Sequence, residues 1–148
     1  MDNKEKQILV TVISLFLIFT FYSFYIYYEY IADNFEIIND FMFWGKVFLV
    51  IIPVTIVSQI LIHIICAIIN KAVTKEDIET KTDERDKIIN LKAIRISHFI
   101  ITFGFVVSMV TQAIGMQQHV MFLTWVCFGF IAAIVSELAK IHYYRKGF

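Results

Sequence analysis

The sequence contains few residues that interrupt helices. It has one proline and five glycines among 148 residues, which leaves little room for loops or linkers. We find no composition shift that would mark a domain boundary, no low-complexity tract and no internal repeat. These absences predict a single domain over residues 1–148.

Cysteine and net charge are equally scarce. The two cysteines, Cys66 and Cys127, both fall inside apolar runs, which predicts buried free thiols rather than a disulfide or a set of metal ligands. Thirteen basic and thirteen acidic residues give a net charge of zero. Because nucleic-acid binding needs a basic surplus on one face, this balance argues against direct contact with nucleic acid.

The motifs of common enzyme classes are missing as well. The sequence has no Walker A, GxSxG, GxGxxG or CxxC motif. It also has no HxxxH or HxxE pair that would place two metal ligands on one helix. We therefore expect that the protein is not an enzyme and that it holds no cofactor and no metal.

The sequence is instead rich in apolar residues, which make up 59% of the chain, and its mean hydropathy is +0.72. A membrane-spanning helix needs roughly 20 consecutive, mostly apolar residues, and four stretches qualify. They predict an all-α fold, an integral membrane four-helix bundle. The predicted spans are residues 8–28, 47–69, 93–115 and 120–139.

The basic residues predict how these spans are oriented. Of the 13 Lys and Arg residues, all but Lys46 flank the spans on one side, which includes both termini and the loop 70–92. Because lysine and arginine accumulate on the cytoplasmic side, we expect both termini and this loop in the cytoplasm. The acidic loop 29–46 would then lie outside, and the protein would be a multi-pass protein of the cytoplasmic (inner) membrane.

The stretch TDERDKIINLKAIRISHF, residues 82–99, joins a charged segment to the third span without a break. Thr82 or Asp83 is a suitable N-cap for a helix, and no glycine or proline intervenes before Gly104. We expect one helix from about Asp83 to about Gly115 that begins in the cytoplasm and continues through the membrane. Small and polar residues share one face of it, and we expect that face to pack on other helices: Asp86, Asn90, Ala93, Ser97, Gly104, Ser108, Thr111 and Gly115. A shorter stripe follows on the fourth span: Gly129, Ala133, Ser136 and Lys140.

Two sequence motifs resemble an uncharacterised family of small prokaryotic multi-span membrane proteins. DERDKIINLKAIRIS, residues 83–97, is similar to a D-E-R-D/E-x-x-I-x-x-K-A-x-R-I motif that precedes a membrane helix in that family. The end of the chain is similar to the family's E-x-x-K and Y-Y-R-R-G-F terminus. Members are often encoded beside helix-turn-helix regulators, and the resemblance therefore implies a regulatory partner but no activity. The matching positions are Asp83, Glu84, Arg85, Asp86, Lys92, Arg95, Glu137, Lys140, Tyr143, Tyr144, Arg145 and Gly147.

Ionisable and amide side chains inside the spans are costly to bury and are therefore candidates for function. They are Gln59, His63, His98 and Glu137. One interpretation is a polar cavity open to the cytoplasm, to which Thr55, Cys66 and Asn70 would add. The other is hydrogen bonding between helices, with Glu137 paired to Arg95, Lys92 or Lys140. A membrane enzyme that uses His63, His98 and Glu137 is a third and weaker hypothesis.

The sequence thus favours a binding or regulatory membrane protein. Its partner would dock on the charged cytoplasmic helix and the basic-aromatic tail, through Asp83, Glu84, Arg85, Asp86, Lys92, Arg95, Tyr143, Tyr144 and Arg145. The alternative is an oligomeric transporter or channel that uses the polar residues of spans two and three. The expected partners are the lipid bilayer, a cytosolic or membrane protein and, for transport, further copies of the chain.

Overall fold

The computed structural model describes residues 3–74 and 83–146, and in these ranges the chain is almost entirely helical and contains no strand. The four long helices are α1 (Asn3–Ile26), α2 (Phe41–Thr74), α3 (Glu84–Ala113) and α4 (Gln118–Lys146). Two short helical segments connect α1 to α2, namely the π-helical turn η1 (Tyr27–Ile31) and the 3-10 helix η2 (Phe35–Asn39). The predicted all-α fold is confirmed.

All four long helices are long and apolar enough to cross a membrane. They contain 24 to 34 residues, or about 36–51 Å at 1.5 Å per residue, which exceeds the roughly 30 Å of a bilayer core. The structure thus supports a multi-pass membrane protein with four spans. The helices also continue past the apolar runs: α2 begins at Phe41 rather than Val47 and ends at Thr74.

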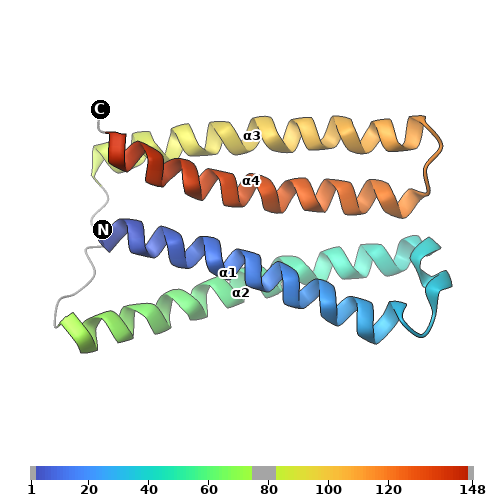
Figure 1. The fold of residues 1–148 in the computed structure, drawn as a ribbon, viewed down its shortest axis with the longest axis horizontal. Helices are drawn as coiled ribbons and strands as arrows, with labels where there is room; N and C mark the ends of the chain where they lie inside the picture. The colour runs from blue at the N-terminus through green and yellow to red at the C-terminus, as the bar shows by residue number, and fades with distance from the viewer. Residues whose placement is uncertain (1–2, 75–82, 147–148) are drawn as a thin grey trace.

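The four helices form two pairs: α3 and α4 lie on one side of the molecule, and α1 and α2 cross each other on the other side (Figure 1). α3 and α4 form an antiparallel hairpin that packs along its length, α4 also packs on α1, and α1 crosses α2 (Figure 1). Within the described residues, no Cα atom of α2 comes within 8 Å of α3. α1 lies beside α4 toward the end that holds the termini, whereas α2 lies beside α4 near η1 and η2, where the rings of Phe41 and Phe48 contact that of Phe122 (Figure 1).

The interface between α3 and α4 is built on small side chains, as the stripe on the third span predicts. Ala93, Gly104 and Ser108 of α3 are buried, and a Cβ added to Gly104 would overlap the side chain of Phe128 on α4. Not every member of the stripe contributes. Asn90 is exposed, and Gly115 lies beyond α3, in the turn before α4, with a φ of 78°.

The stripe predicted on the fourth span is buried only in part, and Ala132 rather than Ala133 is the buried alanine. Ser136 is buried as expected, and Ala132 is also fully buried. Gly129 and Ala133 instead line a groove of about 360 Å³ that residues of α1, α2 and α3 border as well. Because adjacent helical positions differ by about 100° in direction, a stripe of small residues on a sequence does not fix which neighbour it meets.

An aromatic and aliphatic cluster closes one end of the molecule. Ile26, Phe43, Trp44 and Val47 are buried there, and Phe122 of α4 packs against them. The indole Nε1 of Trp44 donates a hydrogen bond to the Ile38 carbonyl at 2.7 Å. This contact fixes the segment between α1 and α2 over the end of the bundle.

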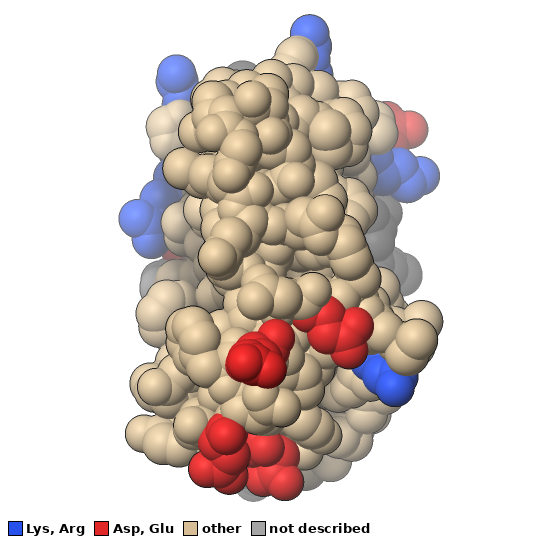
Figure 2. Space-filling model, turned by 90° about the vertical axis from the view of Figure 1, so that its right-hand side faces the viewer, with Lys and Arg blue, Asp and Glu red and all other residues tan. Residues whose placement is uncertain are grey.

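The two ends of the molecule differ in charge. Both termini and the start of α3 lie at one end, whereas η1, η2 and the turn between α3 and α4 lie at the other (Figure 1). Figure 2 looks onto this second end, where acidic side chains gather with a single basic side chain beside them. The acidic residues of that connection are Glu29, Asp33, Glu36 and Asp40. The arrangement places the predicted cytoplasmic segments together, although orientation in a membrane remains a prediction.

Candidate functional site

The candidate site begins at the capped first turn of α3. Asp83 is the N-cap, and its side chain accepts hydrogen bonds from the backbone N–H of Asp86 and, at 2.7 Å, from that of Glu84. The side chain of Asp86 accepts in return from the Asp83 backbone N–H at 2.9 Å. This reciprocal capping box satisfies N–H groups that have no partner inside the helix, which explains two aspartates at this spacing. Thr82, the other predicted cap, lies outside the described residues.

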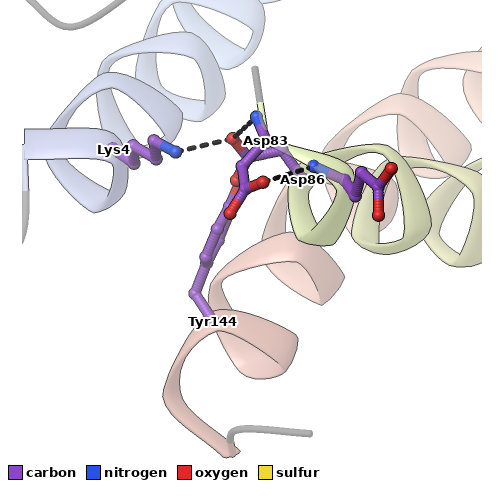
Figure 3. A network of polar contacts seen from close by, with 5 residues as sticks. Lys4, Asp83, Asp86 and Tyr144 are labelled. Carbon is purple, nitrogen blue, oxygen red and sulfur yellow. Dashed lines mark hydrogen bonds and ion pairs between the residues drawn. The ribbon is translucent and has the colours of Figure 1, made fainter. Parts of the chain in front are cut away.

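Asp86 also connects three helices. Its carboxylate accepts a hydrogen bond from the Lys4 ammonium of α1 at 2.6 Å and from the Tyr144 hydroxyl of α4 at 2.7 Å. Figure 3 shows Lys4 and Tyr144 both reaching Asp86 beside the start of α3. The side chain of Asp86 is only 11% exposed, and its several donors replace the water that a carboxylate loses on partial burial.

Two further contacts attach the end of α4. The Arg145 guanidinium donates from Nε and Nη2 to the two carboxylate oxygens of Glu5, at 3.0 and 3.3 Å, the forked geometry in which arginine binds carboxylates best. Arg85 donates from Nη2 to the backbone carbonyl of Tyr144 at 3.1 Å. We call Lys4, Glu5, Arg85, Asp86, Tyr144 and Arg145 the polar cluster.

Both carboxylates of the polar cluster are paired with a base, and Arg85 leaves the cluster with a net positive charge. Lys4 pairs with Asp86 and Arg145 pairs with Glu5, so that each carboxylate has a basic partner within 3.0 Å. A cluster of this kind fixes the relative positions of helices, because each charge has a directional partner. It therefore holds the beginning of α1, the beginning of α3 and the end of α4 in one arrangement.

The remaining predicted docking residues lie at two other places. Glu84 is exposed on the first turn of α3. Lys92 and Arg95 lie further along α3, and the Lys92 ammonium sits 5.6 Å from the ring centroid of Tyr143 on α4. The predicted docking residues therefore divide among the polar cluster, in which Arg85 and Arg145 are exposed, an exposed first turn and a basic-aromatic region further along α3.

Two of the polar residues inside the spans, Gln59 and His63, pair with a neighbouring helix. The Gln59 amide donates to the Ser14 hydroxyl at 2.9 Å, and His63 Nε2 lies 3.0 Å from the Thr11 hydroxyl, both between α2 and α1. Glu137 pairs with Lys140 on its own helix at 2.6 Å, one of the three partners expected for it. The side chain of Asn70 lies outside the described part of the chain.

His63 and His98 do not share a site. His63 is on α2 and His98 is on α3, two helices that do not contact each other within the described residues. His98 is exposed. Two grooves, of about 750 and 360 Å³, are lined almost entirely by apolar residues and include neither histidine nor Glu137. This arrangement favours helix pairing over a shared polar cavity.

Metal ligands do not gather either. In residues 3–74 and 83–146, no three His, Cys, Asp or Glu side chains are grouped so that they could hold a metal ion. Cys66 and Cys127 are free thiols, each partly rather than fully buried.

Sequence analysis did not identify two members of the polar cluster, Lys4 and Glu5. They are adjacent at the start of the first span, where Lys4 counts toward the predicted orientation and Glu5 belongs to no recognised pattern. Their partners follow 82 and 140 residues later, and no local pattern links positions so far apart. Comparison of the chain with protein-family models, with curated proteins and with solved structures gives no match.

Proposed function

We propose that this protein is a membrane-embedded binding module that presents the start of α3 and the end of α4 to a regulatory protein in the cytoplasm. The observation that carries the proposal is the polar cluster. It joins residues from the two ends of the chain and from its middle, and it holds two exposed helix ends in a fixed arrangement (Figure 3). A fixed surface binds with less loss of conformational entropy than a flexible one.

The exposed side of this arrangement offers charges of both signs. Glu84 and Lys87 on the first turns of α3 and Lys146 at the end of α4 are exposed. Asp86 and Tyr144 instead face the polar cluster. We assign docking to the exposed group and support of the surface to the internal group. Complementary charges on a partner would set the specificity and rate of association more than the affinity.

The resemblance to a family with regulatory neighbours supports the same proposal. The two segments that carry the resemblance, at residues 83–97 and at the end of the chain, contact each other. Asp86 and Arg85 of the first segment bond to the hydroxyl and the carbonyl of Tyr144 in the second. Both motifs therefore contribute to one surface. Gly147, which also matches the family's ending, lies outside the described residues.

Transport through an oligomer is the second candidate, and the contacts inside the spans favour it less. Gln59 and His63 each have a partner on α1. Polar residues that pair helices need no transported species to account for them.

Co-purification with a matched pair of variants tests the docking proposal. The tagged full chain is extracted from its host membrane in mild detergent, and the bound proteins are identified by mass spectrometry. We expect one stoichiometric partner, and we expect Glu84→Lys/Lys87→Glu to lose it at least tenfold while thermal unfolding is unchanged. The control is Glu36→Lys/Lys46→Glu, which exchanges two exposed charges near the opposite end, and it should retain the partner. Equal capture by both double variants, or capture of no stoichiometric partner by the unmodified chain, would refute the proposal.

A further inference from the structure

Two cations and two aromatic rings form a patch on the surface of α3 and α4, further along the bundle than the polar cluster. Lys92 and Arg95 lie about one turn apart on α3, and both are exposed. The Lys92 Nζ lies 5.6 Å from the ring centroid of Tyr143, and the Arg95 Cζ lies 5.9 Å from that of Phe99. We call these four side chains the basic-aromatic patch.

The patch lies at the start of the predicted third span, which begins at residue 93. Lys92 and Arg95 follow the first residue of α3, Glu84, by eight and eleven residues, or about 12 and 16 Å along the helix axis. Beyond them, Phe99 and Phe103 have exposed fractions of 63% and 62%. On a helix that crosses a membrane, such rings meet acyl chains. Long basic side chains beside them extend to the headgroup level.

We propose that the basic-aromatic patch binds the headgroup of an anionic phospholipid. Lys92 and Arg95 contact its phosphate, while Phe99 and Phe103 lie along an acyl chain. The charges are complementary, since Lys92 and Arg95 are two exposed cations on one stretch of α3 and the phosphate of the lipid is an anion. Basic side chains at the level of the headgroups attract anionic lipids in this way.

The aromatic contacts are compatible with phosphate binding. A lysine ammonium near an aromatic ring keeps its charge, and a guanidinium can stack its face on a ring while its edge still donates N–H groups. The rings therefore position the cations and leave them able to bind an anion.

Depth distinguishes a lipid from a soluble protein as the occupant. A cytosolic partner reaches the first turn of α3, at Glu84 and Lys87, but it does not reach Phe99 and Phe103 inside the acyl region. A phospholipid meets the cations and the rings together. The patch is thus separate from the docking surface proposed above, and each can fail without the other.

Native mass spectrometry of the purified full chain tests the inference. The protein in mild detergent is titrated with dioleoylphosphatidylglycerol, or with dioleoylphosphatidylcholine, which has the same chains and no net charge. We expect phosphatidylglycerol to bind at least tenfold more tightly. Lys92→Gln/Arg95→Gln should abolish this preference. Lys87→Gln/Lys146→Gln, which removes two exposed cations from the same end, should retain it.

Each other outcome overturns the inference. Equal binding of the two lipids by the unmodified chain would show that no anionic site exists. An equal loss in both double variants would show a diffuse charge effect rather than a site. If Lys92→Gln/Arg95→Gln does not fold, the single variants Lys92→Gln and Arg95→Gln take its place, and unchanged preference in both contradicts the proposal.

Discussion

A single glycine sets the distance between α3 and α4. Gly104 has no side chain, and the Phe128 side chain occupies the space where a Cβ would lie. In a membrane, helices associate through close packing because lipid is as apolar as the side chains themselves. The absence of a methyl group at Gly104 therefore permits Phe128 of α4 to pack directly on α3 at this position.

Substitution of Gly104 by alanine should destabilise the protein. The added Cβ overlaps Phe128, and the side chain or the helices must shift, which typically costs about 1–3 kcal/mol of unfolding free energy. The measurement is unfolding of the purified protein from mixed micelles by SDS titration. Gly129→Ala is the matched control, because nothing lies within 4 Å of its added Cβ. Equal stability of the two variants would show that α3 and α4 do not pack this closely.

At the scale of the element, α1 is the helix that packs on both α2 and α4. It bonds to α2 through Ser14 and Thr11, and it packs on α4 through Phe19, whose ring centroid is 4.4 Å from that of Phe130. Its first turn enters the polar cluster through Lys4 and Glu5. α1 therefore forms hydrogen bonds with α2 inside the spans, whereas its polar contact with α4, between Glu5 and Arg145, lies at its first turn.

A double-mutant cycle between Ser14 and Gln59 should measure the energy of the hydrogen bond between α1 and α2. Hydrogen bonds between membrane helices contribute about 0.6 kcal/mol on average, so Ser14→Ala and Gln59→Ala should be non-additive by roughly that amount. SDS-induced unfolding of the four species measures it. The control cycle replaces Ser14→Ala by Thr20→Ala. It should be additive with Gln59→Ala, because the Thr20 hydroxyl donates to the Phe16 carbonyl of its own helix at 2.8 Å. Additivity in the Ser14 cycle would mean that this bond does not hold α1 on α2.

At the scale of the whole molecule, the distribution of charge predicts the orientation. The end that carries the termini holds the basic residues of the polar cluster and of α3. The opposite end is acidic apart from Lys46 (Figure 2). Because basic residues are retained in the cytoplasm, the bundle should insert with the termini inside.

Cysteine labelling of intact cells checks this orientation. In a background with Cys66→Ser and Cys127→Ser, single cysteines are introduced by Glu36→Cys or Lys146→Cys, both at exposed positions. A membrane-impermeant maleimide should label position 36 in intact cells and position 146 only after permeabilisation. The reverse pattern would place the termini outside, and labelling of both positions in intact cells would indicate mixed insertion.

Much of this fold follows from local pattern. The length of the apolar runs determines four spans, and the charged stretch that leads into the third run without a helix breaker determines that α3 begins at Glu84. The Asp83 and Asp86 spacing determines the cap of that helix. These features depend on neighbours within a few residues, where hydrogen-bonding rules and helix periodicity are decisive.

The tertiary structure alone decided which helices meet. An apolar helix surface is equally satisfied by lipid or by another helix, and the sequence therefore does not show that α2 stays apart from α3 or that Gly129 and Ala133 line a groove. It also does not show that Asp86, Lys4 and Tyr144 form one network, because those residues are 58 and 82 positions apart. The sequence determined the spans, the cap and the charge of each end, since these are local. The packing of the helices determined the polar cluster and the basic-aromatic patch, since each combines side chains from helices that meet only in the folded molecule.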